Sequence, residues 1–379
     1  MNSTKRFIIF ILTLIIIALL SWVVIFFAQG YRLSGFGIFS QNRAPLIEKT
    51  GMLMVKSWPD GARLFVDDEL KGPTNISVAN LTPSNHKIKV LKEGHFEYTK
   101  TVVIYEELVT VVDALLVPLS PTLSPLTYNG AAHTSIAPSG SSLVYASFGN
   151  GEPGGIWKLD LNSGSPASLL ASDRTGISFS KVNEFLWSPN EAEVLAKVNS
   201  QYYLLSFNTA NMAPVPVESE VVLAAWEKTA KEKKDVKVEK QKLPLAMQKI
   251  ATASSTLWAF DEKRFLYEAL DPALGTKQYR IYSLLDPRPV GEAEDYIAFE
   301  KDQSDTEVKS VFWYGDGRHL VIVTEGKIYL REIDGENKVL VFSGNFDSSR
   351  VYAKPGGGGV IILTSFNEQA PQNFYLIGI

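Results

Sequence analysis

Residues 7–28 form a continuous apolar run in which none of the 22 side chains is charged. As a helix this run would measure about 33 Å, which is enough to cross a hydrocarbon core of about 30 Å. Backbone groups in lipid must form hydrogen bonds within their own segment, so a helix is the expected form. We therefore predict a transmembrane helix over residues 7–28, preceded by a short tail of residues 1–6.

Charges on either side of this run predict its orientation. Lys5 and Arg6 directly precede it, whereas Arg32 is the sole basic residue in the first dozen positions after it. Because basic residues favour the cytoplasmic side, we expect a cytoplasmic N-terminus and an extracytoplasmic C-terminal body. A cleaved signal peptide is the alternative, but its apolar region usually spans only about 7 to 15 residues. The length of the run favours an uncleaved single-pass anchor in the cell membrane.

After the anchor the pattern changes to short runs with β character. Residues 29–49 show no sustained periodicity and predict a linker. Turn residues at 59–61 and 72–75 then separate short β runs, which predicts a small all-β domain over residues 50–119. The predicted strands are residues 52–57, 63–67, 87–91, 101–104 and 109–117.

Beyond Pro118 the sequence repeats itself. Each copy consists of an aromatic or apolar residue, a tight turn and a β run. The copies begin at Ile136, Trp187, Trp258, Trp313 and Ala353. A second series of strands follows these turns in the same order, at residues 156–161, 202–207, 279–284, 328–333 and 374–379. Multi-stranded repeats of about 40 to 50 residues are typical of a β-propeller, so we predict five blades over residues 120–379; a pair of β-sandwiches is the alternative.

The last copy ends at Ile379, directly after its third strand, whereas the copy before it has a fourth strand at residues 338–342. An unpaired edge would expose backbone hydrogen-bonding groups and promote aggregation. We therefore predict that residues 121–128, just before the first copy, pair with the last one.

A charged segment interrupts the repeat between Trp187 and Trp258. Residues 227–242 contain seven lysines and four acidic residues. We predict a solvated, charged helical insertion over residues 226–252, because mixed charge runs are usually exposed. Docking of a lysine-rich helix on an anionic envelope polymer is the alternative.

Composition excludes several classes of function. The 37 basic and 41 acidic residues give a net charge of −4, which provides no basic surface for nucleic acid. Cysteine is absent, so disulfides and thiolate metal sites are excluded. No nucleophile elbow, phosphate-binding loop or dinucleotide fingerprint occurs. We predict no catalytic, metal or cofactor-binding residue, and no cofactor.

Histidines and tyrosines are two further groups of residues that could bind a ligand. The four histidines lack metal-ligand spacing and are expected at the surface, beside turns or strand ends; they are His86, His95, His133 and His319. Most tyrosines of the repeat strands are expected to pack between blades, although several on one open face would suit stacking on sugar rings. Envelope glycan and protein therefore both remain as partners.

Motifs in both β regions resemble known families. The run from Gly51 to Ala62, with Gly72–Thr74 and Lys92–Phe96, resembles the PEGA domain, with Asp60 in place of the usual Glu. The resemblance implies a small β-sandwich that serves as a surface module in envelope proteins, without catalytic residues. Residues 120–379 resemble TolB-type propellers, and Ser188–Glu191 is the copy most similar to their Ser-Pro-Asp-Gly turn.

These observations predict an all-β chain with one N-terminal transmembrane helix. We expect a non-catalytic, membrane-anchored binding or scaffolding protein of the cell envelope, held in the lipid bilayer by residues 7–28. An extracytoplasmic propeller hydrolase or lyase is the alternative, and it would place two carboxylates across the central channel. A sensor of envelope state is a third hypothesis, which the six-residue tail makes less attractive.

Overall fold

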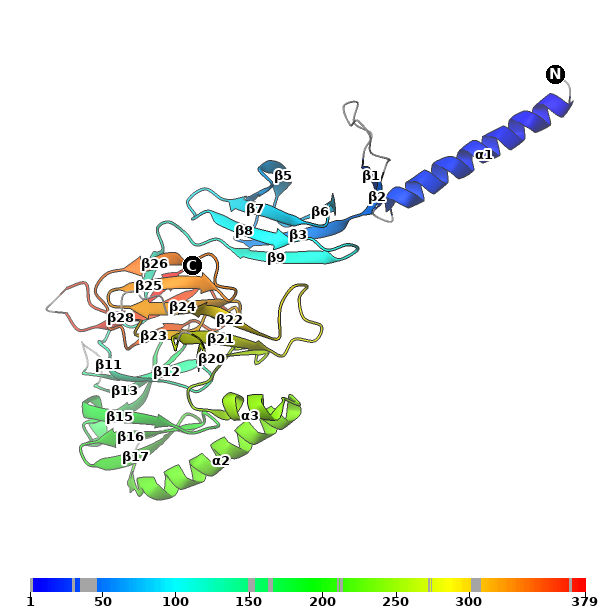
Figure 1. Ribbon diagram of the computed structural model, residues 1–379. Coiled ribbons are helices and arrows are strands. Elements are labelled where there is room, and N and C mark those ends of the chain that lie inside the picture. Colours follow the sequence, from blue (N-terminus) through cyan, green and yellow to red (C-terminus); the bar gives the residue numbers. More distant parts are fainter. Residues whose placement is uncertain are drawn as a thin grey trace. The chain divides into compact units, whose positions relative to one another are not determined.

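The structure is a computed structural model, and Figure 1 shows its helices and strands. It describes residues 3–28, 31–34, 46–148, 154–162, 166–209, 211, 214–271, 273, 275–300, 308–367 and 370–379. The chain divides into two compact units, Met1–Leu116 with Pro289–Glu292, and Val117–Arg288 with Ala293–Ile379. The second unit is called the repeat domain below.

Helix α1 (Ser3–Ala28) contains the predicted transmembrane segment. Its stretch Phe7–Ile25 has a mean hydropathy of 3.2, and none of it is buried within the protein. The hydroxyl of Thr13 donates a hydrogen bond to the carbonyl oxygen of Ile9 at 2.8 Å, so this polar group is satisfied inside the helix. The helix is long and apolar enough to cross a membrane, properties that a signal sequence shares.

The predicted linker contains regular structure. Strand β1 (Tyr31–Ser34) pairs antiparallel with β2 (Leu46–Lys49). The sequence did not reveal this pairing within the predicted linker, because strands of four residues are too short to give a recognisable alternation. Residues 29–30 and 35–45 of that prediction lie outside the described residues.

The first β domain consists of two sheets around one core. In one sheet β3 lies between β6, which is antiparallel to it, and β9, which is parallel to it. The other sheet has the order β5, β4, β7, β8. Their bounds are β3 (Gly51–Trp58), β4 (Arg63–Val66), β5 (Glu69–Pro73), β6 (Ile76–Leu81), β7 (Asn85–Leu91), β8 (Tyr98–Val103) and β9 (Val109–Leu115). Leu53, Leu64 and Ile88 are fully buried between the two sheets.

Strands β5 and β6 were missed by the sequence prediction, which placed a loop over residues 72–75. In the structure Gly72 and Pro73 end β5, and Thr74 with Asn75 connects it to β6. Glycine and proline are depleted in strands, and β6 carries the polar residues Ser77 and Asn80, so neither segment shows a clear β pattern.

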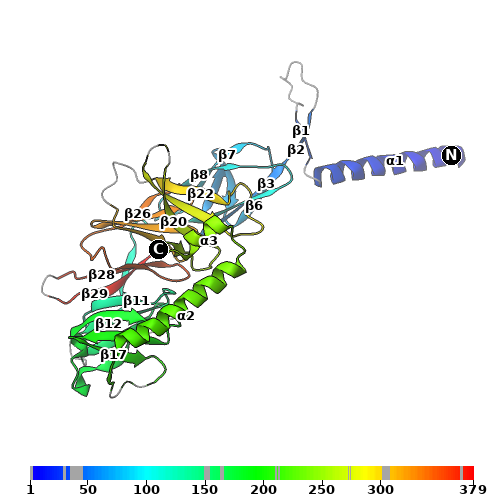
Figure 2. The same ribbon diagram turned by 60° about the horizontal axis from the view of Figure 1, so that its bottom comes forward.

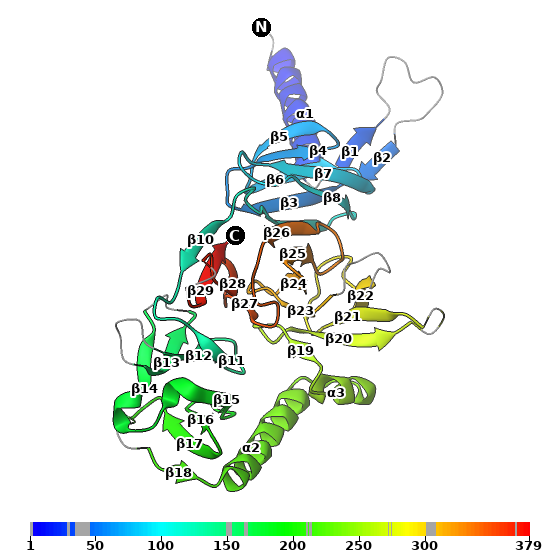
Figure 3. The same ribbon diagram turned by 90° about the vertical axis from the view of Figure 1, so that its left-hand side faces the viewer.

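The described part of the repeat domain forms five four-stranded antiparallel sheets, seen in Figure 3. Sheet 1 comprises β11 (Ala132–Ile136), β12 (Ser142–Ser147), β13 (Gly155–Asp160) and β14 (Ser168–Ser172). Sheet 2 comprises β15 (Val182–Trp187), β16 (Glu193–Val198), β17 (Gln201–Ser206) and β18 (Pro216–Val217). Sheet 3 comprises β19 (Leu257–Trp258), β20 (Arg264–Leu270), β21 (Lys277–Ser283) and β22 (Asp295–Glu300).

Sheets 4 and 5 follow the same order. Sheet 4 comprises β23 (Ser310–Trp313), β24 (His319–Thr324), β25 (Lys327–Glu332) and β26 (Val339–Ser343). Sheet 5 comprises β27 (Val351–Ala353), β28 (Gly359–Thr364), β29 (Asn373–Gly378) and the early strand β10 (Thr122–Pro125). Every residue used to align the repeat ends the first strand of its sheet, and the second series coincides with the third strands. Both predicted series are confirmed.

Strand β10 completes the last sheet. It pairs antiparallel with β29, with Thr122 opposite Gly378 and Pro125 opposite Tyr375. The amide of Leu126 extends the pairing by donating to the carbonyl oxygen of Phe374 at 2.7 Å. This confirms the prediction that residues 121–128 supply the missing strand, so the two ends of the repeat domain are held together.

Apolar cores join three pairs of neighbouring sheets, and helices lie between a fourth pair. One core joins sheets 1 and 2, another joins sheets 3 and 4, and a third joins sheets 5 and 1. Between sheets 2 and 3 the chain forms α2 (Ser219–Lys240) and α3 (Leu245–Thr252). Figure 3 shows α2 running from β18 to α3, near β19, and Figure 2 shows the two helices from another side. Val238 and Ala251 from these helices pack with Phe265 and Tyr282 of sheet 3.

Candidate functional site

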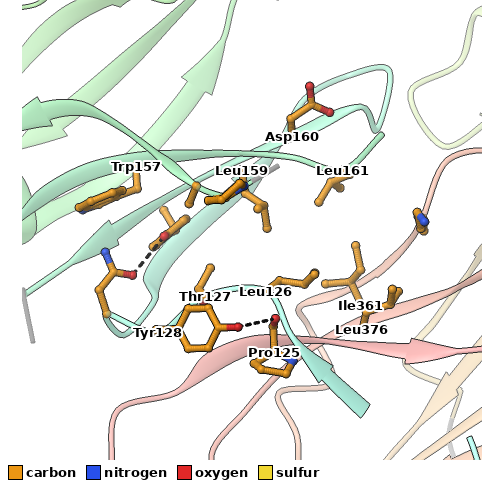
Figure 4. Close-up of a pocket in the computed structure, with 15 residues that line it drawn as sticks. Pro125, Leu126, Thr127, Tyr128, Trp157, Leu159, Asp160, Leu161, Ile361 and Leu376 are labelled. Atoms are coloured by element: carbon orange, nitrogen blue, oxygen red, sulfur yellow. Dashed lines mark hydrogen bonds between the residues drawn. The ribbon is translucent and has the colours of Figure 1, made fainter. Parts of the chain in front are cut away.

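A pocket of about 550 Å³ lies where sheet 5 meets sheet 1, shown in Figure 4. We call it the seam pocket, because β10 joins the two ends of the repeat domain there. It is lined by Pro125–Asn129, Tyr145, Trp157, Leu159–Leu161, Pro166, Ala167, Lys354, Ile361 and Leu376. Its volume lies in the range of small-molecule sites, and its walls are mainly apolar, as in most such sites.

The alternation of β13 creates one wall of the pocket. Trp157, Leu159 and Leu161 face sheet 5 and pack in the core shared with it. Lys158 faces the opposite way, with its Nζ 4.5 Å from the ring centroid of Phe207 in sheet 2. Leucine and tryptophan on one side of the strand therefore give the pocket an aliphatic and aromatic surface.

Asp160 lines the pocket without directing its charge into it. In Figure 4 its carboxylate points away from Leu159 and Leu161. Its Oδ1 accepts a hydrogen bond from the amide of Asn162 at 2.8 Å. The side chain therefore caps the turn after β13.

Two tyrosines border the pocket. The hydroxyl of Tyr145 donates to Oδ1 of Asn129 at 3.1 Å, and burial raises the pKa of Tyr145 well above its usual range. This phenol therefore stays protonated at any physiological pH. Tyr128 is 73% exposed, and its hydroxyl reaches the carbonyl oxygen of Pro125 at 3.5 Å (Figure 4).

Two donors of the lining have no acceptor among the described residues. Nε1 of Trp157 is buried and makes no hydrogen bond. Lys354, half-buried in the turn after β27, has no hydrogen bond or ion pair at Nζ within the described ranges. Lys354 therefore offers an ammonium to the pocket, whereas Nε1 of Trp157 is enclosed in its wall.

The expectation that all four histidines lie at the surface is wrong for His86 and His319. They are 6% and 4% exposed. Nδ1 of His86 lies 2.6 Å from Oδ2 of Asp67, and Nδ1 of His319 lies 2.6 Å from Oδ2 of Asp316. A histidine at a strand end can thus be buried when a carboxylate from a nearby turn pairs with its imidazole. His133 is exposed, as predicted.

Asp316 also shows how such a pair is stabilised. Burial alone would raise its pKa, but hydrogen bonds from the imidazole and amide of His319 and from the amide of Arg318 outweigh it, so the pKa is lowered. These contacts make the pair a structural feature of the turn between β23 and β24.

The structure also brings together three acidic residues that sequence reasoning did not single out. Carboxylate oxygens of Glu332, Asp334 and Glu336 lie within 4.8 Å of one another. Asp334 and Glu336 are exposed, and Oε2 of Glu332 accepts a hydrogen bond from Nδ2 of Asn337 at 3.2 Å. Exposed acidic groups of this kind are common without an ion, so we assign no metal site to them.

Tyrosines of the repeat strands pack mostly as predicted. Tyr203 and Tyr282 are buried in inter-element cores, and Tyr279 stacks on Phe299 with ring centroids 4.7 Å apart. Tyr329 packs against the core of sheets 3 and 4. The aromatic residues of the seam pocket are others, Tyr128, Tyr145 and Trp157, and no contiguous motif joins them.

Comparisons with known proteins agree with the sequence resemblance in the first β domain. Residues 50–120 match the family model of the PEGA domain, which covers less than a fifth of the chain. No curated protein matches the chain by sequence.

Solved structures similar to the chain include TolB from Acinetobacter baumannii, with 12% identity, a TM-score of 0.21, and coverage of 78% of this chain and 55% of that one. The putative TolB from Agrobacterium tumefaciens has 14% identity, a TM-score of 0.23, and coverage of 65% and 78%. The β-propeller domain of the Trilobed protease from Pyrococcus furiosus has 10% identity, a TM-score of 0.23, and coverage of 87% and 96%.

The chain thus spans about half the length of the Acinetobacter protein. All three TM-scores are low, so the description of the repeat domain rests on its own strand pairing. The chain contains a PEGA domain at residues 50–120, followed by a β domain whose neighbours among solved structures include TolB and other β-propellers.

Proposed function

We propose that this protein is a membrane-anchored, extracytoplasmic binding protein of the cell envelope, without a catalytic role. The observation that carries the proposal is the seam pocket, whose mainly apolar lining includes Lys354, an ammonium without an acceptor in the described chain. The apolar helix α1 supports anchoring, and the PEGA domain supports a place in the envelope. The partner would be an envelope component that enters the pocket.

The proposed organisation follows the sequence boundaries. A cytoplasmic tail (1–6), a membrane helix (7–28) and a linker (29–49) precede a PEGA-type β-sandwich (50–119). A five-bladed propeller (120–379) with a helical insertion (226–252) follows. Five sheets in chain order, with β10 closing the last, support the propeller within the described residues.

Binding is favoured over catalysis by the chemistry of the pocket. General acid–base or nucleophilic catalysis needs two groups directed at one reacting atom. Asp160 is the carboxylate of the described lining, and it points away from the apolar wall (Figure 4). A lone ammonium in an apolar pocket is suited to holding a ligand.

Membrane topology can be tested by cysteine labelling, because the natural chain has no cysteine. We would make Ser3→Cys in the N-terminal tail and Leu245→Cys in α3, where Leu245 is 78% exposed. A membrane-impermeant maleimide added to intact cells should label Leu245→Cys and leave Ser3→Cys unmodified until the cells are permeabilised. The opposite pattern would contradict the proposal.

Binding itself can be tested by photocrosslinking in cells. A photoreactive amino acid at Tyr128, on the rim of the seam pocket, should capture an envelope component, whereas the same residue at Leu245 serves as an equally exposed control. Separate extraction of lipid, glycan and protein would show the class of the adduct. Equal capture at both positions would argue against the pocket as the binding site.

A further inference from the structure

Hydrogen bonds account for most polar groups of the seam pocket. Thr127 Oγ1 donates to Oδ1 of Asn373 at 3.1 Å and accepts from the amide of Phe374 at 2.9 Å. Tyr145 donates to Asn129, and Tyr128 to the carbonyl oxygen of Pro125. These groups satisfy one another and make no demand on a ligand.

The donor that remains defines what a ligand must offer. Lys354 Nζ lacks an acceptor among the described residues and cannot act as an acceptor itself, whereas Nε1 of Trp157 is enclosed in the wall and does not reach the pocket. The carboxylate of Asp160 is directed away from the apolar wall (Figure 4). Lys354 supplies the positive charge of the lining. A ligand with hydrogen-bond acceptors and a negative charge therefore complements this pocket, whereas a cationic ligand does not.

The apolar surface defines the rest of the ligand. From Trp157 to Leu161 the wall extends about 13 Å, at 3.3 Å per residue. Opposite this wall lie Leu126, Ile361 and Leu376, which are aliphatic. A surface of this kind favours an aliphatic chain, since each methylene buried there is removed from water.

We propose that the seam pocket binds an aliphatic chain carrying a carboxylate, with the carboxylate at Lys354 and the chain against the leucines of sheets 1 and 5. The inference rests on the proposed binding role and names the ligand class. Two sources share this chemistry, a fatty acid and the carboxyl end of an apolar peptide. Both place a carboxylate beside an apolar chain, so the experiment must separate them.

The test uses the full chain in lipid nanodiscs and four photoreactive probes. Dodecanoate and dodecanol, each bearing a diazirine, form one pair; a trileucine peptide with a free carboxylate and the same peptide with an amide end form the other. Crosslinked peptides are mapped by mass spectrometry. Labelling of α1 reports how much of each probe enters the lipid, so pocket labelling is expressed relative to it.

We expect at least one carboxylate probe to label peptides that contain residues 125–129 or 157–161. Stronger labelling by the dodecanoate pair would indicate a fatty acid, and stronger labelling by the trileucine pair would indicate the carboxyl end of a peptide. In Lys354→Gln, labelling by that carboxylate should fall roughly tenfold, since a charge-assisted hydrogen bond is lost, while its neutral partner should be unaffected. Trp157→Phe, which keeps an aromatic ring in the wall and removes an N–H that is enclosed there, should change labelling less than roughly twofold. The matched control Lys327→Gln, at an exposed lysine of β25, should change neither probe.

Equal pocket labelling by carboxylate and neutral probes would overturn the assignment of the carboxylate. Labelling confined to α1 would overturn binding of aliphatic carboxylates to this pocket altogether. Neither result bears on membrane topology, which cysteine labelling measures independently, so failure of this inference is distinguishable from failure of the proposed anchoring and location.

Discussion

Two junctions of the repeat domain solve the same packing problem in different ways. Between sheets 2 and 3 the chain inserts α2 and α3, and Val238 of α2, Ala251 of α3 and Leu243 of their connection are buried against sheet 3. Between sheets 5 and 1 the sheets meet directly and leave a pocket of about 550 Å³. Unfilled space between sheets costs stability. The chain fills the junction of sheets 2 and 3 with its own side chains and leaves the junction of sheets 5 and 1 open. The open junction therefore provides a binding site at a cost in packing.

The largest effect is expected at the filled junction. Phe265 is fully buried, and its ring centroid lies 5.0 Å from that of Trp258 and 5.2 Å from that of Tyr282. Phe265→Ala should lower the free energy of unfolding of the repeat domain by about 3–5 kcal/mol. Differential scanning fluorimetry in nanodiscs would detect this as a lower Tm.

Leu270→Ala provides the control for that substitution, since Leu270 lies on the same strand and is 67% exposed. Its effect should stay within roughly 0.5 kcal/mol. A comparable loss from both variants would mean that the helices do not form a packed core with sheet 3.

Replacing a small side chain by a larger one at each junction should affect stability differently at the two junctions. Ala251 in α3 is 5% exposed, whereas Ala167 lines the seam pocket and is partly buried. Ala251→Leu should cost about 1–3 kcal/mol through overpacking, because its surroundings are already filled. Ala167→Leu should leave the Tm nearly unchanged, because its added methyl groups enter open space. Equal costs at the two positions would show that the pocket is closed in solution.

Local sequence signals accounted for the framework of the repeat domain. Trp187, Trp258 and Trp313 each precede a tight turn, and that spacing gave the register of the sheets. The position of β10 followed from a general rule, that a sheet edge left unpaired at Ile379 needs a partner. The first signal depends on residues that are close in sequence, and the second depends on the absence of a single strand from the last sheet.

The seam pocket could not be predicted, because its lining comes from segments that are distant in sequence. Tyr128, Trp157 and Lys354 belong to a connection, a third strand and a turn, and none of them carries a motif. The pairing of Asp316 with His319 was easier to predict, since the two residues are three positions apart within one turn. Asp67 and His86 lie at the ends of different strands, so their pairing could be recognised only from the folded structure.

The smallest change in stability is expected from substitution of one lysine at each junction, Lys237 and Lys354. Nζ of Lys237 in α2 lies 3.9 Å from the ring centroid of Trp258 and 2.9 Å from Oε1 of Glu262. Lys237→Gln should therefore cost about 1 kcal/mol, which combines a cation–π contact with a partly exposed ion pair. Part of the loss should disappear at high salt or in the Glu262→Gln background, because the ion pair is screened or already absent.

Lys354→Gln should change stability by no more than roughly 0.5 kcal/mol in the absence of ligand, because its ammonium has no partner among the described residues. The two variants are compared by Tm in nanodiscs made without fatty acid. If Lys354→Gln were as destabilising as Lys237→Gln, its charge would serve the fold through a contact formed in solution, and the seam would lose the cation that distinguishes it from the filled junction. If Lys354→Gln leaves the Tm unchanged and lowers only labelling by the carboxylate probe, Lys354 serves ligand binding, whereas Lys237 serves stability.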